Sequence, residues 1–334
     1  MGNIPAAVLS LLSKYNIVVV LMKDTLNRWG KEKKPFVFLI DFECRKPLAW
    51  LMEDCADDFK YNFQGVSNHN FSKSVRQFQF DKAPVSLDEY AVKFNKVKDH
   101  ISYGNSFLIN LTCSTTITTD LSHQDIFEAT SSKYRVWFKN NFVCFSPETF
   151  IKIKNGKIYS FPMKGTIDAN IQDAEAIILN NPKEQAEHAT IVDLIRNDLS
   201  RVSKNVKVLR YRYYEELQTQ QGKIGQVSSE IAGELPDNFN ECIGDIIFSL
   251  LPAGSVSGAP KKKTLEAILD IEEIERGYYT GIAGYFDGNE LDSCVLIRYV
   301  EGNNIFRSGG GITFQSTLAE EYQEMTDKIY VPIY

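Results

Sequence analysis

The chain has 334 residues, a formal net charge of −6 at pH 7 and 43% apolar residues. Aromatic side chains make up 12% of it, which excludes a disordered chain, and an acidic chain lacks the basic face that nucleic-acid binding needs. The length suits one or two domains, and no apolar run approaches the ~18 residues that cross a bilayer. We therefore expect a globular protein without nucleic-acid or membrane partners.

The cysteines and the start of the chain indicate a reducing compartment. None of the six cysteines forms a Cys-x-x-Cys pair of the kind that binds zinc or exchanges disulfides. No charged segment followed by an apolar stretch opens the chain, so no signal peptide is evident. We expect reduced thiols and a cytoplasmic protein.

Residues 1–85 are predicted to form an N-terminal subdomain or the edge of a sheet. Residues 17–22 and 36–42 are short runs of β-branched and aromatic side chains, which favour strands. Residues 64–74 are rich in Asn and Ser and are predicted to form a loop.

A capping box marks the first clear helix. Ser86 is followed three residues later by Glu89, and Gly104 closes the segment. Apolar side chains recur at helical spacing between them, at Tyr90, Phe94, Val97 and Ile101.

Hairpin signals dominate the later strands. Asn155-Gly156 predicts a two-residue turn between strands 150–154 and 157–161, and residues 279–312 resemble a meander. A further strand is expected at 106–118, and helices at 181–202, 241–251, from 260 onward and at 319–330. Because hairpins outnumber strand–helix–strand units, the pattern favours an α+β fold with antiparallel sheets and helices outside.

Two pairs of glutamates lie three residues apart on predicted helices, Glu184 with Glu187 and Glu321 with Glu324. The spacing puts each pair on one helix face. If the two faces meet, their oxygens suit a hard cation such as Mg²⁺. The alternative is that both pairs lie on solvated helix surface.

Two stretches of small residues are candidates for close approach of an anion. Residues 252–261 lead into a helix whose N-terminus favours negative charge, and residues 309–311 are consecutive glycines. The alternatives are a packed turn and a β-bulge. The candidate binding residues in these stretches are Ser257, Gly258, Lys261, Gly309, Gly310 and Gly311.

Lys164 and Glu148 are candidates for covalent and acid–base chemistry. Lys164 becomes a nucleophile only if burial or a neighbouring cation lowers its pKa; otherwise it is a solvated surface lysine. Glu148, if buried at a strand end, would have a raised pKa and could serve as an acid. His188 is a lone histidine on a helix, for which a structural hydrogen bond is the favoured interpretation.

Several sequence blocks in a fixed order resemble the chorismate-utilising enzymes. They are Ser146-Pro147-Glu148, Pro162-Met163-Lys164-Gly165-Thr166, Lys183-Glu184-Gln185-Ala186-Glu187-His188, and stretches 191–199, 252–261, 276–281, 309–312 and 321–324. The resemblance covers residues 87–330. It implies an α+β fold of two packed antiparallel β-sheets flanked by helices, like anthranilate synthase component I, with residues 86–334 as the chorismate-binding catalytic domain.

Within this family the chain looks like component I of aminodeoxychorismate synthase, because Lys164 stands where anthranilate and isochorismate synthases usually carry Ala. That resemblance implies Mg²⁺-dependent amination of chorismate at C4, giving 4-amino-4-deoxychorismate for p-aminobenzoate and folate synthesis. Lys164 would attack C2, and ammonia would then add at C4 and release the lysine. The ammonia is expected from a separate glutaminase subunit, since no glutaminase nucleophile pattern is apparent in this chain.

The resemblance also implies roles for the acidic residues. Glu148 would handle the proton of the departing C4 hydroxyl. Glu187 and Glu324 would be direct Mg²⁺ ligands, with Glu184 and Glu321 in the supporting shell. The metal would hold the ring carboxylate of chorismate.

The pyruvyl carboxylate would be held by Tyr279 and Arg298, assisted by backbone N–H groups of residues 309–311. Two positions depart from the family pattern. Leu108 stands where isochorismate and salicylate synthases have a lysine that activates water, which counts against those activities. Gln226 stands where many members have a histidine.

Two rival functions fit the same sequence blocks. Anthranilate synthase component I shares the metal and substrate residues, and Lys164 argues against it. A catalytically silent chorismate-binding subunit is opposed by the joint presence of Glu148, Lys164, Glu187 and Glu324.

Overall fold

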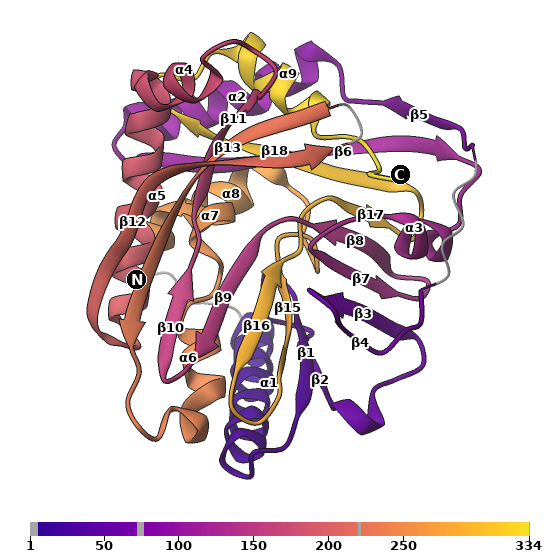
Figure 1. Ribbon diagram of the computed structural model, residues 1–334, viewed down its shortest axis with the longest axis vertical. Helices are drawn as coiled ribbons and strands as arrows, with labels where there is room; N and C mark the ends of the chain where they lie inside the picture. Colours follow the sequence, from indigo (N-terminus) through magenta and orange to yellow (C-terminus); the bar gives the residue numbers. More distant parts are fainter. Residues whose placement is uncertain (1–5, 72–76, 220–221, 334) are drawn as a thin grey trace.

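The computed structural model describes residues 6–71, 77–219 and 222–333, and within these ranges the strands form two nine-stranded antiparallel sheets (Figure 1). Sheet A has the order β11-β13-β10-β9-β16-β15-β1-β2, with β12 paired to β13. Its strands are β1 (Phe36–Ile40), β2 (Leu48–Leu51), β9 (Thr149–Lys154), β10 (Lys157–Ser160), β11 (Met163–Asp168), β12 (Lys204–Thr219), β13 (Gly222–Glu234), β15 (Ile282–Phe286) and β16 (Leu291–Val295).

Sheet B has the order β14-β6-β18-β17-β8-β7-β3-β4, with β5 paired to β6. Its strands are β3 (Phe59–Phe63), β4 (Val66–Ser67), β5 (Phe80–Ala83), β6 (Leu108–Thr119), β7 (Tyr134–Phe138), β8 (Phe142–Ser146), β14 (Gly258–Ala259), β17 (Tyr299–Glu301) and β18 (Ile305–Thr313). The segment before residue 86 therefore supplies strands to both sheets, β1 and β2 to sheet A and β3 to β5 to sheet B.

The α-helices are α1 (Ala6–Lys31), α2 (Leu87–Ser102), α3 (His123–Ala129), α4 (Ala174–Asn180), α5 (Pro182–Ser200), α6 (Ile243–Ser249), α7 (Gly254–Ser257), α8 (Lys261–Glu272) and α9 (Leu318–Asp327). Short 3-10 helices occur at η1 (Met52–Asp54) and η2 (Phe239–Cys242). Within the described ranges, no helix combines the length and apolar character needed to span a membrane. All six cysteines are free thiols.

The sheets pack face to face around an aromatic core, and helices cover their outer faces. Along β1, Val37 and Leu39 face the inter-sheet core, whereas Phe36 and Phe38 face the helices outside sheet A, as the two-residue period of a strand requires. Helices α1, α5 and α6 pack on sheet A, and α2, α3, α8 and α9 pack on sheet B (Figure 1). The predicted α+β arrangement of two packed antiparallel sheets flanked by helices is confirmed.

Local sequence signals placed several elements correctly. Ser86 and Glu89 form both reciprocal bonds of the capping box at the start of α2. Asn155 and Gly156 both have positive φ, 51° and 70°, as the turn between β9 and β10 requires. The side chain of Asn181 caps α5.

The strand predicted at residues 17–22 is wrong, because these residues lie inside α1. Their β-branched character favoured a strand, but Ile17 and Leu21 are exposed and make no core. The better signal follows them: Met22, Leu26 and Trp29 recur at helical spacing and pack on the sheet A core.

Three segments differ in detail from the sequence prediction. Residues 252–261 are not only a loop, since they contain α7 and β14. The long hairpin of β12 and β13 was not predicted, because charged and apolar side chains do not alternate cleanly along β12. In the predicted loop at 64–74, residues 66–67 form β4, and residues 72–74 lie outside the described residues.

Candidate active site

The glycines of β18 form the floor of the candidate site. Gly309, Gly310 and Gly311 pair with β6 in continuous register, so the stretch is a regular strand rather than a bulge. A Cβ at Gly310 would lie 3.3 Å from Glu321 Oε2 and 3.5 Å from Glu324 Oε1. A Cβ at Gly311 would lie 3.0 Å from Lys164 Nζ. The glycines thus leave room for these charged groups to lie against the backbone.

Four glutamates from two helices converge above this floor. Glu184 and Glu187 lie in the first turns of α5, and Glu321 and Glu324 lie in α9. Glu187 and Glu321 are buried, with 8% and 3% exposure. The alternative that both pairs lie on solvated helix surface is therefore wrong for these two residues.

The carboxylates act on one another electrostatically. Burial raises the pKa of Glu184, and the neighbouring charges of Glu187 and Glu324 raise it further. Burial likewise raises the pKa of Glu321, against a hydrogen bond donated by Ser316 Oγ at 2.6 Å. Carboxylate oxygens are the ligands that a hard cation such as Mg²⁺ prefers, so the donor chemistry of this cluster fits such a cation.

Lysine side chains partly neutralise this cluster. Lys164 Nζ lies 3.5 Å from Glu187 Oε2, Lys183 Nζ lies 3.7 Å from Glu321 Oε1, and Lys328 Nζ lies 2.6 Å from Glu324 Oε1. The Glu324 side chain is half exposed; partial desolvation tends to raise its pKa, but the adjacent Lys328 ammonium lowers it overall. Among the described residues, no three His, Cys, Asp or Glu side chains stand as a ready-made metal cage. Instead, the carboxylates of Glu187, Glu321 and Glu324 each lie close to a lysine ammonium group.

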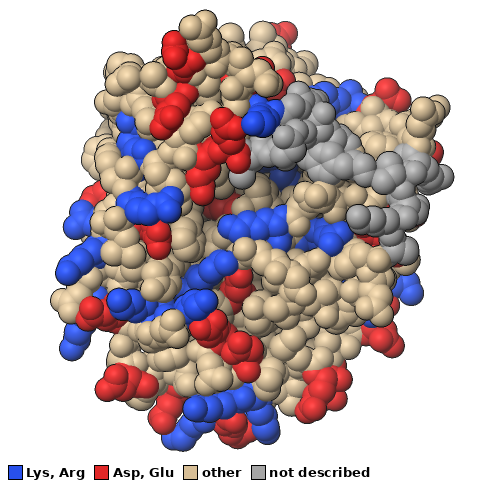
Figure 2. Space-filling model, in the orientation of Figure 1, with Lys and Arg blue, Asp and Glu red and all other residues tan. Residues whose placement is uncertain are grey.

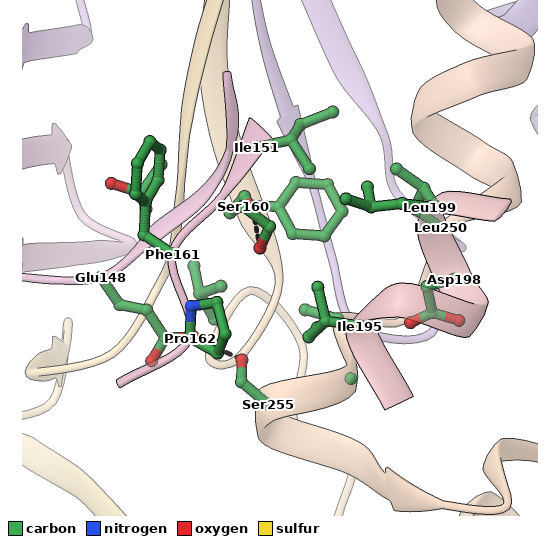
Figure 3. Close-up of a pocket in the computed structure, with 15 residues that line it drawn as sticks. Glu148, Ile151, Ser160, Phe161, Pro162, Ile195, Asp198, Leu199, Leu250 and Ser255 are labelled. Atoms are coloured by element: carbon green, nitrogen blue, oxygen red, sulfur yellow. Dashed lines mark hydrogen bonds between the residues drawn. The ribbon is translucent and has the colours of Figure 1, made fainter. Parts of the chain in front are cut away.

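Glu148 lies at the crossing between the two sheets, after β8 and before β9. Ser255 Oγ, in α7, donates a hydrogen bond to Glu148 Oε1 (Figure 3). Burial raises the pKa of Glu148, while this hydrogen bond and the charges of Lys164 and Arg298 oppose the rise. Both side chains line a cavity of about 20 Å³, roughly the room for one water molecule.

Arg298 is close enough for its charge to act on the pKa of both Glu148 and Tyr279. Tyr279 is buried, which raises its pKa to about 12. Arg298 has a left-handed backbone with φ of 55°, and its buried Nε finds no hydrogen-bond partner among the described residues. An unpaired guanidinium N–H is a group that a ligand carboxylate would satisfy.

The candidates in the 252–261 stretch are engaged within the protein. Ser257 Oγ donates to the Ala253 carbonyl at 3.0 Å, and Lys261 Nζ pairs with Asp198 Oδ2 at 2.7 Å. Gly258 has φ of 137°, and a Cβ there would meet the Leu108 carbonyl at 1.9 Å. Contact of Ser257, Gly258 and Lys261 with substrate stays a prediction. In the structure they contact other parts of the protein.

Sequence reasoning missed two residues of this region, Ser255 and Lys328. Lys328 donates to the Gly309 carbonyl at 2.9 Å as well as to Glu324. Lys328 follows Glu324 by four residues, and this helical spacing could have predicted that the two side chains pair. Ser255 carried no signal of its own within a stretch of small residues.

Leu108, Gln226 and His188 make contacts within the protein interior. Leu108 is buried, and its side chain would contact a Cβ at Gly311 at 3.5 Å, so the wall beside Lys164 is apolar. Gln226 is buried and donates to Ser228. His188 lies 2.7 Å from Ser229 Oγ, and burial lowers its pKa to about 4, as expected for a structural histidine.

Comparisons with known proteins agree with this geometry. The family described as chorismate binding enzyme matches residues 23–333. An uncharacterized PabA-like protein from Haemophilus influenzae is 47% identical over 314 residues, which is 93% of this chain and 96% of that protein. Aminodeoxychorismate synthase component 1 from Bacillus subtilis is 32% identical over 267 residues, which is 74% of this chain and 55% of that enzyme.

Overall identity does not separate the reactions, because relatives named anthranilate synthase component 1 also reach 32%. The crystal structure of anthranilate synthase component I from Streptococcus pneumoniae matches with a TM-score of 0.63 and 26% identity. That match covers 75% of this chain and 58% of the other. The fold is therefore the one expected from the sequence blocks, and the chain belongs to the family of chorismate-binding enzymes.

Proposed function

We propose that the chain is component I of aminodeoxychorismate synthase and replaces the C4 hydroxyl of chorismate with an amino group. The position of Lys164 carries this proposal. Its ammonium lies against Gly311 and 3.5 Å from Glu187, at the floor where the carboxylates converge. A side-chain amine at this place gives the site a nucleophile that an alanine cannot supply.

The charges around the floor suit chorismate, which is a dianion. Arg298 offers an unpaired Nε–H, and Lys328 lies beside the Gly309 carbonyl and Glu324. The cluster of glutamates would hold Mg²⁺ through Glu187 and Glu324, with Glu184 and Glu321 in support. When bound, the metal would neutralise and orient the ring carboxylate.

The residues supply both proton transfer and covalent catalysis. Lys164 Nζ, as the free amine, bonds to C2 while the C4 hydroxyl leaves as water with a proton from Glu148. Ammonia then bonds to C4, and the bond between C2 and Lys164 breaks. The proton released by the incoming amine returns to Glu148. The raised pKa of Glu148 supports this role, because the acid must carry a proton before the hydroxyl leaves.

The ammonia would come from glutamine through a separate glutaminase subunit. The product would supply p-aminobenzoate and hence folate synthesis. The relatives named component 1 support a second component in their own systems.

The test is the product formed from chorismate, ammonium and Mg²⁺ by the pure chain. We expect 4-amino-4-deoxychorismate, identified by mass spectrometry after chromatography. Fluorescent anthranilate would establish the rival synthase activity instead. Intact binding of chorismate without turnover would establish a silent binding subunit.

A further inference from the structure

Lys183 links the two helices that carry the acidic cluster. It follows Pro182 in the first turn of α5, where its backbone N–H donates to the capping side chain of Asn181. Its side chain reaches the first turn of α9, with Nζ 3.4 Å from Glu320 Oε2 and 3.7 Å from Glu321 Oε1. Of these two partners, Glu321 is buried and Glu320 is largely exposed.

The contact places the Lys183 ammonium group beside Glu321, a deeply buried carboxylate of the acidic cluster. Glu321 is 3% exposed, and a buried carboxylate without a cation is costly. Lys164 and Lys328 neutralise Glu187 and Glu324, so Lys183 is the lysine whose ammonium pairs with Glu321. Figure 2 shows acidic and basic side chains interspersed over the face of the molecule drawn there, with both signs near its centre.

We propose that Lys183 is a built-in counter-ion that competes with the divalent cation for the acidic cluster. This inference rests on the proposed function, which assigns the metal to these glutamates. In the metal-free protein the ammonium stabilises Glu321. When the metal binds, the same ammonium repels it or must swing away toward Glu320 and solvent. Lys183 therefore lowers metal affinity while it protects the empty cluster.

The proposal predicts that removing the Lys183 charge strengthens Mg²⁺ binding but destabilises the metal-free protein. Lys183→Met removes the ammonium charge that lies 3.7 Å from Glu321 Oε1, which should tighten Mg²⁺ binding roughly three- to twentyfold. The same substitution should lower the melting temperature in EDTA, because Glu321 loses its cation. The rise in melting temperature with Mg²⁺ should consequently be larger than in the wild type.

The experiment follows thermal unfolding of the full chain, without chorismate, in EDTA and across a MgCl₂ titration at constant ionic strength. Lys183→Arg keeps the charge and should behave as the wild type. Lys263→Met removes an exposed lysine, paired at 3.0 Å with Glu266 on α8, and is the matched control for loss of one surface charge. Lys183→Gln provides a second neutral variant if the methionine variant does not fold.

The expected result is tighter Mg²⁺ binding in the neutral Lys183 variants alone. Equal or weaker binding in those variants, with normal binding in the wild type, overturns the inference about Lys183 and leaves the proposed function in place. If the wild type shows no Mg²⁺-dependent shift at any concentration, the metal assignment in the proposed function falls, and this inference falls with it.

Discussion

At the scale of single residues, the proposed choice among the reactions of this family depends on Lys164. Lys164→Ala should abolish the covalent adduct with chorismate and slow amination by at least about tenfold, because a tethered nucleophile has an entropic advantage over free ammonia. Chorismate binding should persist, since Arg298 and Lys328 remain. Intact-protein mass spectrometry after incubation with chorismate and Mg²⁺, before ammonia is added, measures the adduct.

Lys157→Ala is the matched control for Lys164→Ala, because Lys157 is an exposed lysine of β10, the strand that precedes β11 in the chain. It should form the adduct as the wild type does. If the wild type gains no mass from chorismate and Lys164→Ala turns over at the normal rate, Lys164 is a surface lysine and the anthranilate synthase alternative returns.

Ser255 should set the pH at which Glu148 loses its proton. Burial raises the pKa of Glu148, and the hydrogen bond from Ser255 stabilises the carboxylate and opposes that rise. The rate should fall as pH rises through this pKa, because the deprotonated carboxylate has no proton to give. Ser255→Ala should raise the pKa further and move the alkaline limb of the pH–rate profile up by about one unit.

The profile of kcat/KM against pH, measured with saturating Mg²⁺, checks this shift. Ser255→Thr keeps the hydroxyl and should restore the wild-type limb. An alkaline limb that stays in place or moves down in Ser255→Ala would show that the hydroxyl does not act on Glu148.

At the scale of elements, α5 and α9 matter because each brings glutamates to the same floor. Glu187→Gln should weaken Mg²⁺ binding by more than about tenfold, because a site with few protein ligands has little redundancy. The fold should persist, and circular dichroism would verify it. Activity and Mg²⁺-dependent thermal stabilisation that both match the wild type would remove Glu187 from the metal site.

A second element-scale feature is the buried ion pair at the end of α8. Arg276 donates to Glu272 at 2.6 Å, to the Val256 carbonyl at 2.7 Å and to the Asn110 carbonyl at 2.7 Å. It therefore ties α8 to α7 and to β6, beside the stretch that presents Ser255. The side chains of Arg276 and Glu272 are only 1% and 5% exposed, so neither charge is solvated by water if the other is removed.

Arg276→Met should lower the free energy of unfolding by about 3–5 kcal/mol, because it leaves the charge of Glu272 buried and unpaired. Urea denaturation measures this loss. The double variant Arg276→Met/Glu272→Gln should recover part of it, since no buried charge remains. If the free energy of unfolding of Arg276→Met falls by less than about 1 kcal/mol, the ion pair contributes little to stability.

At the scale of the whole molecule, the two-sheet architecture places the site where strands of both sheets and two outer helices meet. Glu148 lies in the passage from β8 in sheet B to β9 in sheet A, while Lys164 lies in β11 of sheet A and the glycines lie in β18 of sheet B. The distance between the sheets therefore fixes the relative positions of acid, nucleophile and floor. That distance is set by the aromatic core between the sheets.

The chain should aminate chorismate with free ammonia without a partner, whereas amination with glutamine should require a glutaminase subunit. Ammonium should support amination by the pure chain, because the free ammonia in equilibrium with it can enter a site that needs no glutaminase. Glutamine should give no product until a glutaminase subunit is added. Product formation from glutamine by the pure chain, monitored together with glutamate release, would contradict the proposed two-component system.

Short sequence patterns were sufficient to predict the local features. The capping box at Ser86, the Asn155-Gly156 turn and the Asn181 cap depend on neighbouring residues alone, so they could be predicted from short patterns. The glutamate spacings and the position of Lys164 in its block were also visible, because each is a relation within one segment. The strand predicted at residues 17–22 failed, because β propensity yielded to packing of Met22, Leu26 and Trp29 on sheet A.

Which of these groups lie together depends on the three-dimensional fold. Glu184 and Glu324 are 140 residues apart, and no spacing rule brings α5 to α9; the packing of both around β11 and β18 does. The bond from Ser255 to Glu148 spans 107 residues and depends on α7 packing beside the passage between the sheets. Pairing of the carboxylates with Lys183 and Lys328 was likewise invisible, because long side chains choose partners by distance in space and by burial rather than by order in the chain.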